Sequence, residues 1–332
     1  MTTAEPVLQV RDLTKDFPVR QRGRRHLLRA VDGVSLTVAA GETVAVVGES
    51  GSGKSTLARC IARLVEPTSG SVTLGATELL TMPRRDVWRA YGDLQMVFQD
   101  PTSSLNPRMT IRAVLDEPLR LHSDLDAAGR EARIRALLHD VQLRPELLDR
   151  YPHQLSGGQR QRIGIARALA VDPTVVLLDE PTASLDVSVR GRVLQLLRQV
   201  QRERQLGYLL ISHDLQLVRA IADRTLVVYM GGVVEEGRTE DVFADPVHPY
   251  TRALLSAAPI AEHRPRRAPR LHLRGEPPSP LDLPAGCRLA SRCPFAEASC
   301  VQHRPGLLPA GPQHRAACPI VLSARRDDAP AA

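Results

Sequence analysis

The segment from Gly48 to Ser55, Gly-Glu-Ser-Gly-Ser-Gly-Lys-Ser, constrains the fold of this chain more than any other stretch. The apolar run Thr43 to Val47 precedes it and predicts a buried parallel strand, and helical spacing follows from Thr56 to Leu64. Glycines between a strand and a helix let successive backbone N–H groups point at one anion, and the helix start adds its positive end. The segment therefore predicts a phosphate-binding loop.

The residue types of this loop suggest separate roles. The residues expected to contact a nucleotide are Gly48, Glu49, Ser50, Gly51, Ser52, Gly53, Lys54, Ser55 and Thr56. Lys54 would reach the outer phosphates as a positive charge, and the Ser55 hydroxyl would ligate the Mg²⁺ that bridges them. We therefore expect a nucleotide bound together with Mg²⁺.

Composition limits the class of protein and its partners. A chain of 332 residues holds one large domain or two. No apolar run approaches the roughly 18 residues that cross a bilayer, and no signal segment opens the chain, which predicts a cytoplasmic protein. The net charge of +7 is compatible with nucleic acid or an anionic membrane, but 3% aromatic residues weakens the case for base stacking. We expect a solvated basic surface and no nucleic-acid partner.

Two strands with alternating polarity, Val7 to Val10 and Val34 to Val38, predict an antiparallel flank before the loop. Phe17 lies between them. Its ring either stacks on adenine or packs in the core, and the sequence leaves both possibilities open.

Polar side chains follow three of the apolar runs expected to form strands. Gln99 follows Leu94 to Phe98, Asp179 and Glu180 follow Thr174 to Leu178, and His213 comes soon after Tyr208 to Ile211. The carboxyl ends of parallel strands face the ligand crevice of a doubly wound sheet. We expect Asp179 to hold Mg²⁺ and Gln99 to contact Mg²⁺ or the attacking water. Glu180 would polarise that water, and His213 would contact the γ-phosphate.

A second helix start suited to phosphate follows a helical region at residues 111–150. It consists of Ser156, Gly157, Gly158 and Gln159, ahead of an amphipathic helix. One nucleotide cannot easily occupy both helix starts in one chain. We therefore expect an ATP-dependent dimer in which each nucleotide lies between the Lys54 loop of one chain and the Ser156 turn of the other.

Together these motifs carry a family resemblance. They are Gly48 to Ser55, Gln99, Leu155 to Gln159, Asp179-Glu180, Ser184-Leu185-Asp186 and His213. In this order they resemble the motif set of an ABC-type ATPase over about residues 6–240. The resemblance implies an α/β P-loop NTPase with an antiparallel β flank and a helical subdomain inserted at about residues 101–160. It also implies that Asp186 contributes to the nucleotide site and that ATP closes two such domains on a membrane transporter.

Finer features narrow the resemblance to the ATPase subunits of dipeptide and oligopeptide importers. They are the segments Gln99 to Met109, Tyr151 to Gln154 and Pro246 to Thr251. The chain looks most like the second of two such subunits, which implies a different partner ATPase, two permeases and an external binding protein at the cytoplasmic membrane face. Import of nickel or another small solute by the same architecture is an alternative that the sequence leaves open. A soluble ABC ATPase acting on ribosomes or nucleic acid is a remote alternative.

Residues 241–332 are expected to form a C-terminal extension that carries four of the five cysteines. Cys287, Cys293, Cys300 and Cys318 suit a zinc ion or an iron–sulfur cluster, and no pair has the two-residue gap typical of zinc sites. The region resembles the cysteine-bearing extension of peptide-importer ATPases, which favours a 4Fe-4S cluster over zinc or no metal.

Overall fold

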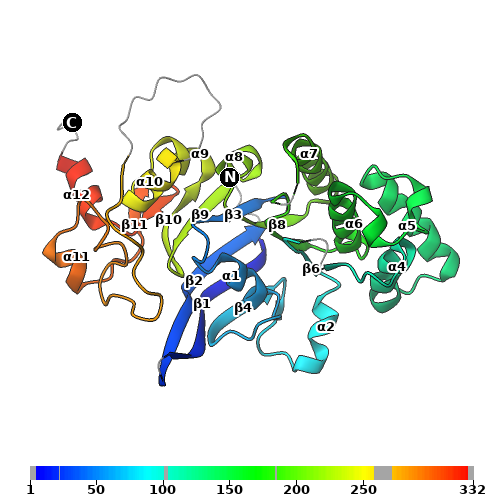
Figure 1. The fold of residues 1–332 in the computed structure, drawn as a ribbon, viewed down its shortest axis with the longest axis horizontal. Coiled ribbons are helices and arrows are strands. Elements are labelled where there is room, and N and C mark those ends of the chain that lie inside the picture. The colour runs from blue at the N-terminus through cyan, green and yellow to red at the C-terminus, as the bar shows by residue number, and fades with distance from the viewer. Residues whose placement is uncertain (1–4, 22, 101–103, 184, 258–270, 328–332) are drawn as a thin grey trace.

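The computed structural model describes residues 5–21, 23–100, 104–183, 185–257 and 271–327 (Figure 1). Two predicted motifs fall partly outside these ranges. They are the importer segment Gln99 to Met109, at residues 101–103, and the Ser184-Leu185-Asp186 motif, at Ser184. Residues 258–270 of the expected C-terminal extension also lie outside them.

The strands form two sheets. Their bounds are β1 Pro6–Gln21, β2 Arg24–Ala39, β3 Thr43–Val47, β4 Ser69–Leu74, β5 Thr77–Glu78, β6 Leu94–Val97, β7 Val175–Asp179, β8 Gly207–Ser212, β9 Arg224–Tyr229, β10 Gly232–Arg238, β11 Leu308–Gly311 and β12 His314–Ala316. One sheet has the order β2-β1-β4-β5, and the other has the order β11-β12-β10-β9-β3-β8-β7-β6.

Helices cover the larger sheet and form a separate group beside it (Figure 1). Their bounds are α1 Lys54–Ile61, α2 Val87–Ala90, α4 Ile111–His122, α5 Ala127–Asp140, α6 Gly157–Leu169, α7 Val187–Arg204, α8 Leu215–Ile221, α9 Thr239–Ala244, α10 Pro249–Ala257, α11 Ala298–Gln302 and α12 Pro319–Asp327. None of the described helices combines the length and apolar character needed to cross a bilayer.

The centre of the larger sheet is parallel and buried on both faces. β3 pairs in parallel with β8 on one side and β9 on the other, and all five of its residues are buried. Successive residues point to opposite faces. Val44 and Val46 pack in the core shared with the antiparallel flank, whereas Ala45 and Val47 pack in the core under the helices. The phosphate-binding loop therefore begins at the end of a strand that is packed on both faces.

The antiparallel flank is longer than the sequence predicts. β1 and β2 pair from Pro6 with Ala39 out to Gln21 with Arg24, so the arginine-rich stretch forms the end of a hairpin. Apolar cross-strand pairs such as Phe17 with Leu28 continue the ladder beyond the alternating runs. Phe17 therefore lies in a strand.

The helical region between β6 and β7 consists mainly of α4, α5 and α6, drawn in green beside β6 in Figure 1. Ile134, Leu137 and Leu138 on α5 are buried. The sequence periodicity predicts this face. The helices pack into the same core cluster as β7 and β8, which places the start of α6 at the side of the main sheet.

The C-terminal region joins the main sheet. β12 pairs with β10 through Glu235 opposite Ala316 and Glu236 opposite Arg315, and β11 pairs with β12. A small core of Val247, Ala316, Val321 and Leu322 fastens the end of the chain to this edge. The residues that carry the cysteines are consequently packed against the strands that flank the phosphate-binding loop.

Candidate functional site

The phosphate-binding loop connects β3 to α1, and two of its glycines are required by close contacts. A Cβ atom on Gly53, whose φ is +99°, would lie 1.9 Å from the carbonyl oxygen of Ala30. A Cβ on Gly48 would lie 2.2 Å from the carbonyl oxygen of Val228. Any side chain at either position would collide with backbone, because the loop packs directly on β2 and β9. The glycines allow the loop to form in this confined space.

Lys54 begins α1, and its side chain folds back over the loop. Its ammonium donates to the carbonyl oxygens of Gly48 and Glu49, each at 2.8 Å, and lies 3.4 Å from the Ser52 hydroxyl. Burial lowers the pKa of Lys54, although the carboxylates of Glu180 and Asp179 partly oppose this. The ammonium is therefore held where loop carbonyls and two acids converge, as a phosphate-binding cation requires.

Ser55 and Asp179 meet across the site. The Ser55 hydroxyl donates to Asp179 Oδ1 at 2.9 Å, and Asp179 is 1% exposed at the end of β7. Burial raises the pKa of Asp179. A hydroxyl beside a carboxylate supplies the hard oxygen donors that Mg²⁺ prefers, and Mg²⁺ sites commonly take only one or two protein ligands beside substrate phosphates. This pair fits such an ion.

Glu180 connects the ends of β6, β7 and β8. Its Oε2 accepts from Gln99 Nε2 at 2.8 Å, and its Oε1 lies 2.9 Å from His213 Nδ1. Its backbone has a left-handed φ of +48°, and its N–H donates to the Ile211 carbonyl at 2.9 Å. The strained turn aims the carboxylate at the sheet edge while two polar neighbours fix its direction. Three predicted site residues that are distant in sequence are therefore in direct contact.

The Ser156 turn does not join this cluster. Ser156 caps α6, accepting from Gln159 N–H at 3.3 Å, while the Gln159 side chain accepts from Ser156 N–H at 2.9 Å. This is a capping box, so both side chains bond within the turn. Asp186 occupies the N-cap position of α7, makes no side-chain capping hydrogen bond and is exposed. Within the described ranges, no hydrogen bond joins Ser156, Gln159 or Asp186 to the Lys54 loop.

The predicted adenine contact of Phe17 stays a prediction. Phe17 is partly buried on β1, and the ammonium of Lys15 lies 4.8 Å from its ring centroid. The ring therefore already takes part in a cation–π contact.

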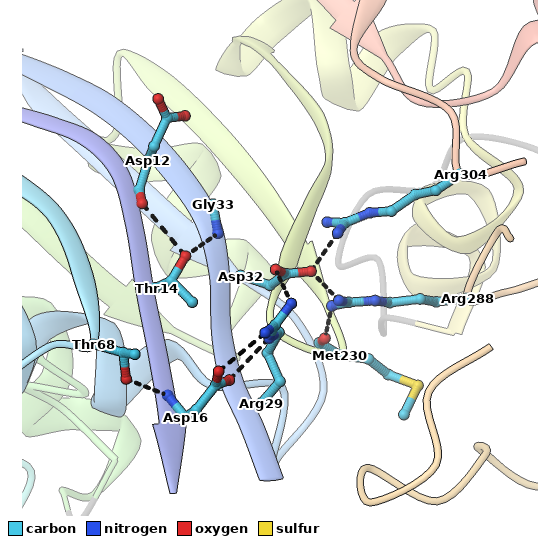
Figure 2. A network of polar contacts seen from close by, with 10 residues as sticks. All are labelled: Asp12, Thr14, Asp16, Arg29, Asp32, Gly33, Thr68, Met230, Arg288 and Arg304. Atoms are coloured by element: carbon cyan, nitrogen blue, oxygen red, sulfur yellow. Dashed lines mark hydrogen bonds and ion pairs between the residues drawn. The ribbon is translucent and has the colours of Figure 1, made fainter. Parts of the chain in front are cut away.

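Sequence reasoning missed a cluster of ion pairs behind the loop, around Asp32 (Figure 2). Arg288 and Arg304, from the cysteine-bearing region, both bond to its carboxylate, and Arg29 lies 3.4 Å from it. The Asp32 N–H donates to the Gly231 carbonyl, and the Gly231 N–H donates to the Ser52 carbonyl in the loop, both at 2.9 Å. The C-terminal region thereby reaches the back of the loop. The sequence gives no local signal for a contact over 256 residues.

The four clustered cysteines line one pocket, with a volume of about 130 Å³. They are Cys287, Cys293, Cys300 and Cys318, all free thiols. Burial raises the pKa of Cys318 to about 11. Within the described residues, no group of three or more His, Cys, Asp or Glu side chains is arranged to hold a metal ion. The predicted 4Fe-4S cluster is therefore not confirmed, although thiols are the donor type that such a cluster takes.

Comparison with known families divides the chain into two matched regions. Residues 31–183 match the model described as ABC transporter. Residues 234–300 match the model described as oligopeptide/dipeptide transporter, C-terminal region. The first match includes the phosphate-binding loop, Gln99 and Glu180, and the second includes Tyr250 and three of the clustered cysteines.

Two curated relatives match nearly the whole chain. The oligopeptide transport ATP-binding protein OppF of Salmonella typhimurium is 47% identical over 310 residues, covering 91% of this chain and 92% of that protein. The chain belongs to the ATP-binding subunits of the ABC transporter family. The oligopeptide transport ATP-binding protein AppF of Bacillus subtilis is 42% identical, and the match covers 96% of this ABC ATPase and 99% of AppF. The expected resemblance to oligopeptide-importer ATPases is confirmed.

Solved structures confirm the fold class of this ABC ATPase. The ATP-binding cassette MJ0796, in a dimeric post-hydrolysis state bound to ADP and Pi, superimposes with a TM-score of 0.64 at 29% identity. The match covers 70% of this chain and 98% of the cassette. CbiO1 from Clostridium perfringens, part of the transporter complex CbiONQ, gives a TM-score of 0.62 at 27% identity, covering 73% of this chain and 92% of CbiO1. ATP hydrolysis is the reaction of this family, and the chain is an ATPase.

Proposed function

We propose that the ATPase powers import of oligopeptides or dipeptides from the cytoplasmic face of the cell membrane. The observation that carries this proposal is the similarity of nearly the whole chain to oligopeptide transport ATP-binding proteins, C-terminal region included. In this arrangement the chain binds two permeases peripherally, together with a second ATPase subunit of a different sequence. An external binding protein delivers the peptide.

The roles of the site residues form part of this proposal. The Lys54 loop, Gly48 to Thr56, binds the phosphates of ATP, and Ser55, Asp179 and Gln99 hold Mg²⁺. When bound, Mg²⁺ neutralises charge on the phosphates. Glu180 orients and polarises the attacking water, and His213 contacts the γ-phosphate. The hydrogen bonds from Glu180 to Gln99 and His213 support a shared task.

The paired arrangement completes the nucleotide site. Ser156, Gly157, Gly158, Gln159 and Asp186 act on the nucleotide held by the partner ATPase, and Phe17 stacks on the adenine of the nucleotide held by its own chain. The separation of the Ser156 turn from the Lys54 loop supports this division, as does the dimeric state named for MJ0796. We assign residues 6–240 to the ATPase domain, with its helical subdomain at about 101–160, and residues 241–332 to the extension.

A groove beside Gln99 is the proposed permease contact. It has a volume of about 240 Å³, and Phe98, Leu121 and Arg167 are among its lining residues. Leu121 on α4 is 61% exposed and gives this pocket an apolar rim that a partner segment could cover. A permease segment with an apolar face fits this surface.

Peptide uptake tests the proposal. Cells lacking the gene should lose uptake of labelled oligopeptides, and the parent gene should restore it. Glu180→Gln should abolish that rescue and slow ATP hydrolysis by about 10²–10⁴-fold while the chain still binds ATP, because the variant loses the general base. Glu240→Gln changes a carboxylate that is 66% exposed and should restore uptake fully. Normal peptide uptake without the gene would contradict the peptide assignment.

We further propose that the cysteine pocket holds a 4Fe-4S cluster. Four thiols around one pocket support this, since such clusters take four cysteine ligands. The cluster would hold the segments carrying the cysteines together. Anaerobic purification followed by iron and sulfide analysis should give four of each per chain, and Cys293→Ser should lower both. Zinc as the sole bound metal would contradict the cluster.

A further inference from the structure

Tyr250 contacts the phosphate-binding loop from a segment that the reaction does not otherwise use. The N–H of Glu49, in the loop, donates to the Tyr250 hydroxyl at 2.8 Å. Tyr250 lies at the start of α10, is 0% exposed, and packs its ring 4.5 Å from that of Tyr229 on β9. A buried tyrosine hydroxyl needs a polar partner, and here that partner is the loop backbone.

The contact fixes the orientation of one peptide unit. The described chain has no cis peptide bond, so the Gly48–Glu49 unit is trans and planar. In a trans peptide the N–H and C=O point in opposite directions. With the Glu49 N–H held by Tyr250, the Gly48 carbonyl points the other way, and it accepts from the Lys54 ammonium at 2.8 Å. The Tyr250 hydroxyl therefore fixes the direction of the Gly48 carbonyl, which accepts a hydrogen bond from Lys54.

The segment before Tyr250 is fixed by buried hydrogen bonds. Glu235 on β10 is 0% exposed and accepts from the N–H groups of Val247 and His248 at 2.7 and 2.8 Å. His314 on β12 lies 2.7 Å from the same carboxylate. The His248 ring in turn accepts from the Tyr250 N–H at 3.2 Å. Because burial lowers the pKa of His248 to about 4, its ring stays neutral and able to accept at neutral pH. These buried hydrogen bonds therefore fix the backbone that positions Tyr250.

We propose that Tyr250 is a positioning residue for ATP binding, which acts by holding the Gly48–Glu49 peptide so that Lys54 meets the phosphates in a fixed loop. This inference rests on the proposed role of the loop in binding ATP. It gives the Pro246 to Thr251 segment a task at the nucleotide site, beyond its use as a family marker. It also makes the C-terminal region part of the nucleotide site.

Calorimetric titration of the purified full-length chain with Mg-ATP tests this inference. Tyr250→Phe removes only the hydroxyl and should weaken ATP binding about 3- to 10-fold, the worth of one neutral hydrogen bond. Tyr208→Phe is the matched control, since Tyr208 is also buried, at 1% exposed, but donates to the Leu197 carbonyl, away from the loop. It should change ATP affinity less than about 2-fold. Equal affinities for Tyr250→Phe and the control would overturn the inference.

Hydrogen exchange provides a readout that a general loss of stability does not give. In the nucleotide-free chain, the Glu49 amide should exchange about 5-fold faster in Tyr250→Phe, and at the parent rate in Tyr208→Phe. Unchanged exchange at Glu49 in Tyr250→Phe, or faster exchange without weaker ATP binding, would each overturn the positioning role. A parent chain that binds no ATP would instead contradict the proposed function, so the two failures are distinguishable.

Discussion

Replacing Asp32 by asparagine should destabilise the protein far more than breaking a surface ion pair. Asp32 is 7% exposed and bonds to Arg288, whose side chain is 9% exposed, and to Arg304, whose side chain is 46% exposed. Burial lowers the pKa of Arg288, and the Asp32 carboxylate opposes this, so the charged guanidinium relies on that partner. Asp32→Asn leaves that guanidinium without a counter-charge, although it keeps its bond to the Met230 carbonyl.

The expected loss of unfolding free energy follows from how deeply each ion pair is buried. Removing one partner of a buried ion pair costs about 3–5 kcal/mol, whereas the half-exposed pair with Arg304 contributes about 0–1 kcal/mol. We therefore expect Asp32→Asn to lower the free energy of unfolding by about 3 kcal/mol or more. For a domain of this size, that loss lowers the melting temperature by about 6–12 °C.

Thermal and urea unfolding of the full chain, followed by circular dichroism, measure this effect. Asp245→Asn is the control, because Asp245 is 72% exposed and its bidentate pair with Arg325 should contribute less than about 1 kcal/mol. Adding Arg288→Met to Asp32→Asn should restore most of the stability, since the unpaired charge is then gone. A loss for Asp32→Asn no larger than that of the control would refute the reasoning.

Three further predictions concern the loop, the acid of β7 and the isolated cysteine. Gly53→Ala should abolish ATP binding measured by calorimetry, because its Cβ would lie 1.9 Å from the Ala30 carbonyl at a φ of +99°; retained affinity would contradict this. Burial raises the pKa of Asp179, so its contribution to folding is present at low pH and is lost as the pH rises through its folded-state pKa. Asp179→Asn should therefore raise the melting temperature of the nucleotide-free chain at pH 7 and remove the Mg²⁺ dependence of ATP binding; a melting temperature no higher than that of the parent would refute the stability prediction. Cys60 is 0% exposed with a pKa of about 11, so iodoacetamide should label it only after unfolding, and mass spectrometry that finds it labelled in the native chain would contradict its burial.

The parts of the fold that were predictable from the sequence depend on local patterns. The apolar run Thr43 to Val47 predicts a buried strand, and the glycines after it predict the phosphate-binding loop. Both patterns are contained within a few consecutive residues. Gln99, Glu180 and His213 were expected at one sheet edge because each follows an apolar run, and the structure brings them into contact. Their roles stay predictions.

The rest depends on contacts between distant parts of the chain. Nothing near Asp32 indicates that it pairs with Arg288, 256 residues later, and nothing near Glu49 indicates Tyr250. The pairing of β12 with β10 was likewise not expected, since three residues carry too little pattern to predict a strand. For the cysteines, spacing identified the group, but only the fold could bring them around one pocket.

The contact between Glu49 and Tyr250 has a consequence for synthesis of the protein. The two residues are 201 positions apart, so at about 5–20 residues per second the ribosome needs about 10–40 s to make Tyr250 after Glu49. During that interval the nascent loop lacks the hydroxyl that orients it. A growing polypeptide should therefore reach its full nucleotide affinity only after Tyr250 has been made, about three-quarters of the way along the 332-residue chain.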